Sequence, residues 1–296
     1  MNHFKLYSLE RIKSEYVEFS FKNKLYIIEK NGASNDKKNF FSLELTAEEI
    51  RNKKFLASLN QSIKSFGIKK LHLRLNPIVR SEDINPLRKI LNKDNFRVSD
   101  INVILLDLRE KKELLRQKLR KSYKSLINKE SKKLSIKFSN NKEHLAIVFN
   151  DWINIYSAAL KRGNSFISPK ASELLLKSIS NEKSLIAIAY DDLGVAGGAL
   201  FSIENDLSIY QSAANANKIE IDKKRGVGHF IIWNSIIKLK EIGVKYLELG
   251  TFYDVEPKTN YLKKWIEKEH KINKFKKGFG GKIANTLYFE KNFNNS

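Results

Sequence analysis

The chain has 296 residues, 42% of them hydrophobic, which is enough for one large domain or two medium ones with buried cores. Cysteine is absent, which excludes disulfide scaffolds, thiol nucleophiles and cysteine-ligated zinc. The formal net charge of +22 fits anionic partners such as nucleotide phosphates, tRNA or an anionic inner-membrane surface, and a lysine-rich compositional bias fits it equally well. No secretory signal or membrane-length apolar run is visible, so we expect a cytoplasmic protein.

The segment 1–108 predicts an α+β arrangement with alternating strands and amphipathic helices. Thr46 and Glu49 have the spacing of a capping box, and Gly67 would end the helix that begins there. In chain order the expected elements are strands at 15–21, 24–29 and 39–45, a helix at 46–66, a strand at 68–75, a helix at 81–91 and a strand at 96–108.

A basic amphipathic helix is expected next, from residue 109 to residue 129. Leu115, Leu119, Ser122 and Leu126 recur at helical spacing between basic residues. The pattern favours a connector helix with a solvated basic face. Contact with an anionic substrate is the alternative.

The second half again predicts strands and helices in alternation. Trp152 and Tyr156 share one face of its first helix, and Gly243 would end its longest helix. The expected elements are helices at 142–160 and from 169, a meander of strands at 184–190, 195–203 and 207–213, a helix at 224–242, a strand at 244–249, a helix at 259–268 and a strand at 285–290.

The two halves repeat one pattern at a constant offset in the numbering, which brings Gly67 onto Gly243. In each half three strands precede a long helix, a glycine and an alternating strand, which indicates duplication of a whole α+β unit. At the same offset Arg225 falls on Glu49, so the glycine loop described next belongs to the second half alone.

The first candidate site is the loop formed by Arg225, Gly226, Val227 and Gly228 at the start of the long helix. Glycines allow a ligand to approach the backbone, and a helix N-terminus offers free N–H groups to phosphate. Arg225 would add a charge-assisted hydrogen bond. An ordinary glycine-containing helix start is the alternative interpretation.

The second candidate site is the run from Phe275 to Gly281, where aromatic residues, lysines and glycines crowd together. A lysine such as Lys276, held on a rigid turn, can stabilise an oxyanion. A glycine-rich turn that packs aromatic residues into the core is the alternative. Gly278 and Phe279 would line the substrate cleft.

Three further residues belong to the predicted cleft, at the end of the expected strand at 244–249 and just after it. Glu248 would act as a general base toward an attacking amine, although a solvated carboxylate at a strand end is the more ordinary interpretation. Tyr253 and Asp254 would line the cleft. The five histidines show no metal-ligand spacing, so we predict no metal site.

These residues resemble the FemAB family and its BioF-like relatives in the GNAT superfamily. The likeness is carried by the long helix with Trp233, the strand that ends in Glu248-Leu249-Gly250, the closing run 275–281 and the segment 119–126. It implies two tandem GNAT-like domains with mixed sheets flanked by helices. It also places Phe275 and Lys276 at the acyl-transfer centre.

The resemblance implies a degenerate GNAT-like domain at 1–108, the basic connector at 109–138 and a GNAT-like acyltransferase domain at 139–296. The implied function is N-acyl or aminoacyl transfer to an amino group of a cell-envelope or surface-polysaccharide precursor, on a sugar or a peptide. The donor is left open between acetyl-coenzyme A and aminoacyl-tRNA. The alternatives are a tRNA-dependent peptidoglycan interpeptide ligase and, in another class, a non-catalytic basic nucleic-acid-binding protein.

Overall fold

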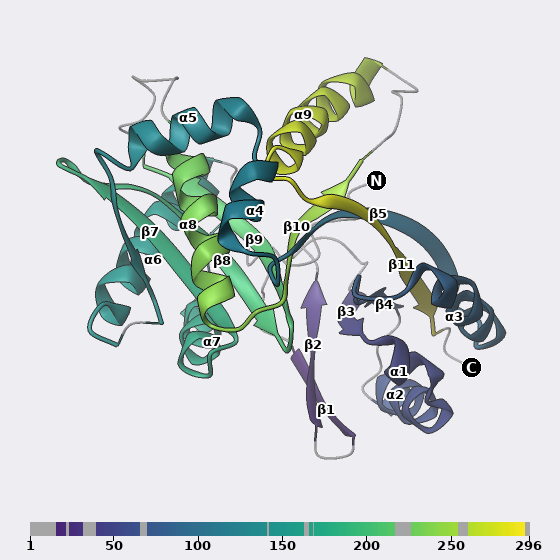
Figure 1. Cartoon of the computed structure of the whole chain (residues 1–296). Coiled ribbons are helices and arrows are strands. Elements are labelled where there is room, and N and C mark those ends of the chain that lie inside the picture. The colour runs from purple at the N-terminus through teal and green to yellow at the C-terminus, as the bar shows by residue number, and fades with distance from the viewer. Residues whose placement is uncertain are drawn as a thin grey trace. The chain divides into compact units, whose positions relative to one another are not determined.

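The computed structural model describes residues 16–21, 24–31, 40–65, 70–140, 142–162, 166–167, 169–216, 226–253 and 260–293 (Figure 1); for 16–31, 40–44, 170 and 260–266 it describes the backbone only. The chain divides into two compact units. The first comprises Met1–Val103 and Ala284–Ser296, and the second comprises Ile104–Ile283. The chain therefore leaves the first unit once and returns to it at its C-terminus.

The first unit is built around a mixed sheet with the strand order β1-β2-β3-β4-β11. The pairs β1–β2, β2–β3 and β4–β11 are antiparallel, whereas β3 and β4 run parallel. The strands are β1 (Tyr16–Phe21), β2 (Lys24–Asn31), β3 (Phe40–Leu45), β4 (Lys70–Leu75) and β11 (Lys282–Asn292), and the helices are α1 (Ala47–Arg51), α2 (Lys53–Ser65) and α3 (Ser81–Lys93). Strand β5 (Arg97–Asp107) begins in this unit and ends in the second.

The capping box at the start of α1 is confirmed. The Glu49 N–H donates to the Thr46 hydroxyl at 3.2 Å, and the Thr46 N–H donates to the Glu49 carboxylate at 2.7 Å. The single helix predicted for 46–66 is wrong, because Asn52 adopts an extended backbone and its side chain caps the next helix at the Phe55 N–H. The predicted stop at Gly67 lies outside the described residues.

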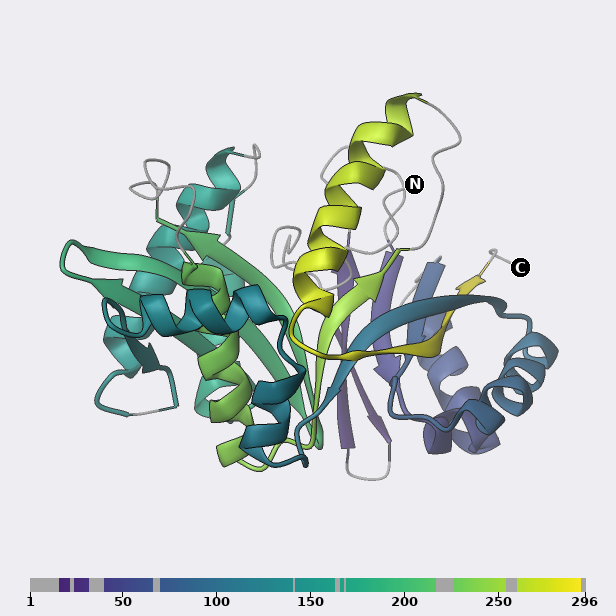
Figure 2. The ribbon, with the colours of Figure 1, turned by 45° about the horizontal axis from the view of Figure 1, so that its top comes forward.

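The second unit contains a sheet with the strand order β5-β10-β9-β8-β7-β6. Helix α8 and the two short helices outside it cover one face, and α6 and α7 cover the other (Figures 1 and 2). Its elements after β5 are α4 (Lys112–Lys118), α5 (Lys121–Glu130), β6 (Ser135–Phe138), α6 (Leu145–Arg162), α7 (Pro169–Ser180), β7 (Ser184–Asp191), β8 (Gly194–Glu204), β9 (Leu207–Asn215), α8 (Val227–Glu241), β10 (Tyr246–Phe252) and α9 (Asn260–Lys277).

The basic connector helix is two helices rather than one. Leu119 and Arg120 adopt extended backbones, and the Arg120 N–H donates to the Gly278 carbonyl at 2.9 Å instead of continuing the helix. The break shifts the buried face by one residue, so Tyr123 and Ile127 are buried where Ser122 and Leu126 were expected. A long-range hydrogen bond has overridden the local helical pattern.

Both units share one connectivity. In each unit three antiparallel strands are followed by a helical segment and by a fourth strand that runs parallel to the third. The helical segment is α1 and α2 in the first unit and α8 in the second. The helices α2 and α8 end at Ser65 and Glu241, and the strands β4 and β10 begin at Lys70 and Tyr246, so both pairs keep the offset that relates Gly67 to Gly243. The predicted α+β class, with mixed β-structure flanked by helices, is confirmed.

Candidate active site

Strands β9 and β10 separate part of the way along their length (Figure 2). They pair only from Leu207 to Ile209 and from Tyr246 to Glu248, although both strands continue beyond those residues. The register of β9 against β8 shifts just there, because Tyr210 and Ser212 face consecutive residues of β8 and Gln211 is an extra residue. Such a bulge bends a strand, which explains the opening between β9 and β10.

Glu248 lies at the last paired position of β10 and is 0% exposed. Its neighbours Leu247 and Leu249 belong to the core around α8, so strand alternation puts Glu248 and Gly250 on the opposite face. The interpretation of Glu248 as a solvated carboxylate at a strand end is wrong. The strand continues through Gly250 to Phe252, which leaves the carboxylate buried within it.

Lys276 lies in the last turn of α9, which corrects the expectation of a rigid turn. Its Nζ is 2.7 Å from the position that a Cβ on Gly250 would take, and Gly250 has a φ of +100°. The left-handed backbone favours glycine at this position, and a Cβ there would also displace the Lys276 ammonium at the end of its flexible side chain. Among the described residues, Lys276 makes no hydrogen bond and no ion pair.

The electrostatic setting of Lys276 follows from its partial burial. Burial lowers the pKa of the ammonium below its ordinary value of 10.5, and the carboxylates of Glu269 and Glu248 act in the opposite direction. A half-buried ammonium without a direct partner can stabilise negative charge that develops on a bound substrate.

Asn273 lies one helical turn before Lys276 and is 4% exposed. Its amide nitrogen donates to the Tyr253 carbonyl at 2.7 Å, which ties the loop after β10 to α9. Burial, followed by the charge of Glu269, raises the pKa of the Tyr253 phenol. Tyr253 thus lies close to α9, which carries Lys276, and its assignment to a substrate cleft stays a prediction. Asp254 lies outside the described residues.

Phe275, Gly278 and Phe279 pack against Tyr123 of α5, and the two phenylalanine rings also lie beside His229 of α8. The Phe275 ring lies 5.0 Å from the His229 ring, and its carbonyl accepts a hydrogen bond from the Tyr123 hydroxyl at 3.1 Å. A side chain on Gly278 would overlap the Tyr123 ring, and Phe279 is 2% exposed in the same core. These contacts give the aromatic residues and Gly278 a packing role, and their catalytic and cleft assignments stay predictions.

At the predicted phosphate loop, at the start of α8, a backbone N–H is hydrogen-bonded to a carboxylate from α5. The Gly226 N–H donates to the Glu130 carboxylate at 3.1 Å, and Glu130 is 1% exposed. A Cβ on Gly226 would lie 2.9 Å from the Leu126 Cβ, so helix packing accounts for this glycine. The assignment of Gly226 to a coenzyme A site stays a prediction. The assignments of Val227 and Gly228 stay predictions, and Arg225 lies outside the described residues.

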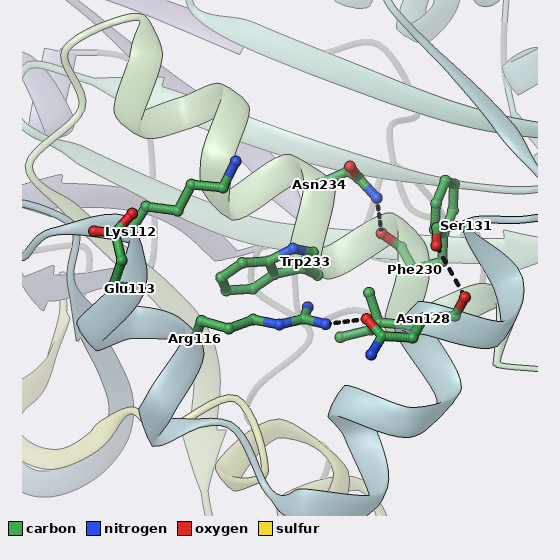
Figure 3. Close-up of a pocket in the computed structure, with 9 residues that line it drawn as sticks. Lys112, Glu113, Arg116, Asn128, Ser131, Phe230, Trp233 and Asn234 are labelled. Atoms are coloured by element: carbon green, nitrogen blue, oxygen red, sulfur yellow. Dashed lines mark hydrogen bonds between the residues drawn. The ribbon is translucent and has the colours of Figure 1, made fainter.

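A cavity of about 390 Å³ lies between α4, α5 and α8 (Figure 3). The Arg116 guanidinium stacks 5.0 Å from the centre of the Trp233 ring and donates to the Asn128 side chain. Burial lowers the pKa of Arg116. The cavity contains none of the predicted site residues; it is lined by Lys112, Glu113, Arg116, Ile127, Asn128, Ser131, Phe230, Trp233 and Asn234.

Neither a metal-binding cluster nor a membrane-spanning helix is found in the described ranges. No group of three or more His, Asp or Glu side chains is arranged to hold a metal ion there. No helix in those ranges has both the length and the apolar character needed to cross a membrane.

The fold has clear relatives among solved structures, although no family model and no curated protein matches the sequence. FemX is similar over 95% of this chain and 88% of its own, with a TM-score of 0.62 and 10% identity. The C-terminal DUF2156 domain of a putative lysylphosphatidylglycerol synthetase from Agrobacterium fabrum is similar over 94% and 84%, with a TM-score of 0.59 and 12% identity. L-PGS from Bacillus licheniformis is similar over 95% and 85%, with a TM-score of 0.55 and 11% identity.

These likenesses show the class of fold, which is that of FemX and L-PGS. The resemblance to the FemAB family expected from the sequence is confirmed at this level. Identities of 10%, 12% and 11% leave the substrate to be argued from the site itself.

Sequence reasoning missed Asn273, Glu269 and Glu130. The first two share α9 with Lys276, and helical periodicity would have included them if the predicted helix had not ended at residue 268. Glu130 has no local signal, because its partner Gly226 is 96 residues away in the chain.

Proposed function

We propose that the chain is an acyltransferase that moves an acyl or aminoacyl group onto an amino group of a cell-envelope or surface-polysaccharide precursor. The observation that carries the proposal is the half-buried Lys276 ammonium, which faces Gly250 beside the opening between β9 and β10 and has no direct partner among the described residues. The FemX-like fold supports the proposal, because the sequence resembles the FemAB family and that resemblance implies acyl transfer.

The proposed chemistry is attack of a neutral amine on the donor carbonyl. The new C–N bond forms, negative charge gathers on the carbonyl oxygen, and the bond to the leaving group then breaks. The Lys276 ammonium stabilises that oxygen more in the transition state than in the ground state. The amine also loses a proton, and the sequence assigns its uptake to Glu248.

The burial of Glu248 suggests a positioning role in addition. A carboxylate that is 0% exposed reaches a substrate amine only through another group, whereas its charge acts directly on Lys276. We therefore propose that Glu248 keeps the Lys276 side chain charged and directed at the opening. Phe275 would exclude water from the same region.

We further propose that the two units are tandem GNAT-like domains that arose by duplication, with the chemistry in the second. Their shared connectivity and the constant offset between equivalent helix ends and strand starts support this. The divisions at 1–108, 109–138 and 139–296 stay our proposal, and the connector helices α4 and α5 pack within the second unit.

The test is a transfer assay with two donors, acetyl-coenzyme A and a mixed aminoacyl-tRNA pool, against amino-sugar and peptide precursors. Product is detected by mass spectrometry. We expect an amide product with wild-type protein and a large loss with Lys276→Met. Absence of product with every donor and acceptor, together with salt-dependent binding of nucleic acid unaffected by Lys276→Met, would favour the non-catalytic nucleic-acid-binding alternative instead.

A further inference from the structure

We propose that the cavity between α4, α5 and α8 is a binding site for a small organic anion, one with an apolar body and a carboxylate or phosphate group. The cavity lies within the second unit and is lined by none of the residues assigned above to acyl transfer. This site is therefore independent of the proposed acyltransferase function, and either proposal can fail without the other.

The cavity has an apolar floor and a polar rim. Ile127, Phe230 and Trp233 are 3%, 5% and 7% exposed and belong to the core of the second unit. Four polar lining residues are exposed, namely Lys112, Glu113, Asn128 and Ser131. The volume of about 390 Å³ falls within the range of roughly 300–1,000 Å³ that is usual for small-molecule sites. Such a floor holds the apolar body of a ligand, and the polar groups around it fix the ligand's orientation.

Arg116 supplies a positive charge that is held in a fixed orientation. Its guanidinium stacks on the Trp233 ring, 5.0 Å from the ring centre, and donates to the side-chain oxygen of Asn128. Figure 3 shows the Arg116 side chain running alongside Trp233 and ending at Asn128. A guanidinium carries several N–H donors, and Asn128 takes one of them. Within the part of the chain that the structure describes, the other donors have no protein acceptor, so a bound anion can take them.

Arg109 shows a similar stack in which the protein supplies the anion. Its guanidinium lies 4.8 Å from the centre of the Tyr246 ring, and its Nε donates to the Asp107 carboxylate at 2.8 Å. Arg116 forms no ion pair with a described carboxylate, although Glu113 lines the same cavity. Burial lowers the pKa of the Arg116 guanidinium, because desolvation disfavours its charge. An anion bound in the cavity would stabilise that charge as Asp107 stabilises Arg109.

The charges and the floor together define the class of ligand. Lys112 and Arg116 contribute two positive charges and Glu113 contributes one negative charge, so the lining is net positive. Carboxylate and phosphate oxygens match the edge of a guanidinium through charge-assisted hydrogen bonds. An inorganic anion would leave the apolar floor in contact with water, whereas an organic anion also buries it. A small anion with an apolar body therefore fits both parts of the cavity.

The experiment titrates phenyl phosphate, phenylacetate and the neutral benzyl alcohol into the full chain at one fixed ionic strength. The indole N–H signals are followed by nuclear magnetic resonance; the chain has three tryptophans, and Trp233→Phe identifies the signal of Trp233. Arg116→Met removes the charge from the cavity and keeps an apolar stem. Arg109→Met is the matched control, because it removes an equal charge that stacks on a ring outside the cavity.

We expect at least one of the two anions to shift the Trp233 signal saturably in wild type and in Arg109→Met. Binding to Arg116→Met should be roughly 10- to 100-fold weaker, the size of the loss of one charge-assisted hydrogen bond. The two anions distinguish a phosphate ligand from a carboxylate ligand. No saturable shift with either anion at millimolar concentration would overturn the proposal. Equal binding of benzyl alcohol, or equal binding by Arg116→Met and wild type, would overturn it as well.

Ser131→Phe gives a second test that keeps every charge. Ser131 lines the cavity just after the end of α5, and a phenylalanine ring there would fill part of the space. We expect this variant to lose the shift of the Trp233 signal although Arg116 is retained. If circular dichroism shows that Arg116→Met does not fold, Ser131→Phe decides alone, and unchanged binding in it would overturn the proposal. None of these measurements depends on acyl transfer.

Discussion

The parallel strand pairs of the two units differ in how far they stay joined. In the first unit β3 and β4 pair at every residue from Phe41 to Leu45 and from Leu71 to Leu75, up to the last residue of both strands. In the second unit β9 and β10 stop pairing at Ile209 and Glu248 and continue apart. One connectivity therefore gives a closed pair in one unit and an open pair in the other, and the extra residue Gln211 accounts for the difference.

The side chains at equivalent positions follow the same division. At the offset that brings Gly67 onto Gly243, Glu248 corresponds to His72 and Gly250 corresponds to Arg74. His72 bonds to the Tyr288 hydroxyl on the neighbouring strand β11, and both are buried. In the second unit the glycine leaves room for Lys276. In the first unit, where β3 and β4 stay paired, the polar side chains are bonded to each other. In the second unit, where β9 and β10 separate, the Lys276 ammonium has no direct partner among the described residues.

The largest expected effect comes from removing that ammonium. Lys276→Met should lower the turnover number by roughly 10²–10³, the size of the loss of one oxyanion donor, while the fold survives. The matched control is Lys274→Met, an exposed lysine on the same helix, which should keep its turnover. An unchanged rate for Lys276→Met in the transfer assay would refute its catalytic assignment.

Gly250 lies beside Lys276 in the candidate active site, whereas Gly243 lies just after the end of α8, so the two glycines can be compared. Both have positive φ, at +100° and +88°, so alanine at either should cost about 1–2 kcal/mol of unfolding free energy from backbone strain. Alanine at Gly250 must also displace the Lys276 Nζ, whereas nothing lies within 4 Å at Gly243. We expect Gly250→Ala to lose most of its activity in addition, measured by chemical denaturation and turnover. Equal activity in the two variants would contradict the placement of Lys276.

The pH dependence tests the state of the same lysine. Burial lowers the Lys276 pKa, so turnover should fall as pH rises through a value below 10.5, where the ammonium loses its proton. The unfolded chain binds more protons than the native one in that window, so the unfolding free energy should increase between the lowered pKa and 10.5. Lys276→Met should lack this increase. A turnover number that stays constant up to pH 10.5 would contradict the proposal that Lys276 acts as an ammonium ion.

The smallest effect should appear in the first unit. Thr46→Ala removes one hydrogen bond of the capping box and should cost about 1 kcal/mol of unfolding free energy. Turnover should stay unchanged, because the chemistry is assigned to the second unit. Thermal unfolding and the transfer assay together check this, and a loss of activity without a loss of stability would give the first unit a direct part in the reaction.

The sequence predicted the elements whose signals are local. The capping box at Thr46, the meander from Ser184 to Asn215 and the stop of α8 before Gly243 are each encoded within a few residues. Lys276 was singled out by the family resemblance of its run of residues. Such features are visible because caps, turns and periodic apolar positions use neighbours in the chain.

Tertiary structure decided the features that depend on distant partners. The break at Leu119 and Arg120 depends on the Gly278 carbonyl, and the setting of Lys276 depends on α9 extending to Lys277. The anion at Gly226 comes from a carboxylate 96 residues earlier. Sequence patterns determined which groups the protein has, and long-range packing determined which of them are paired and which face a substrate, because hydrogen bonds and charges respond to spatial neighbours rather than to chain order.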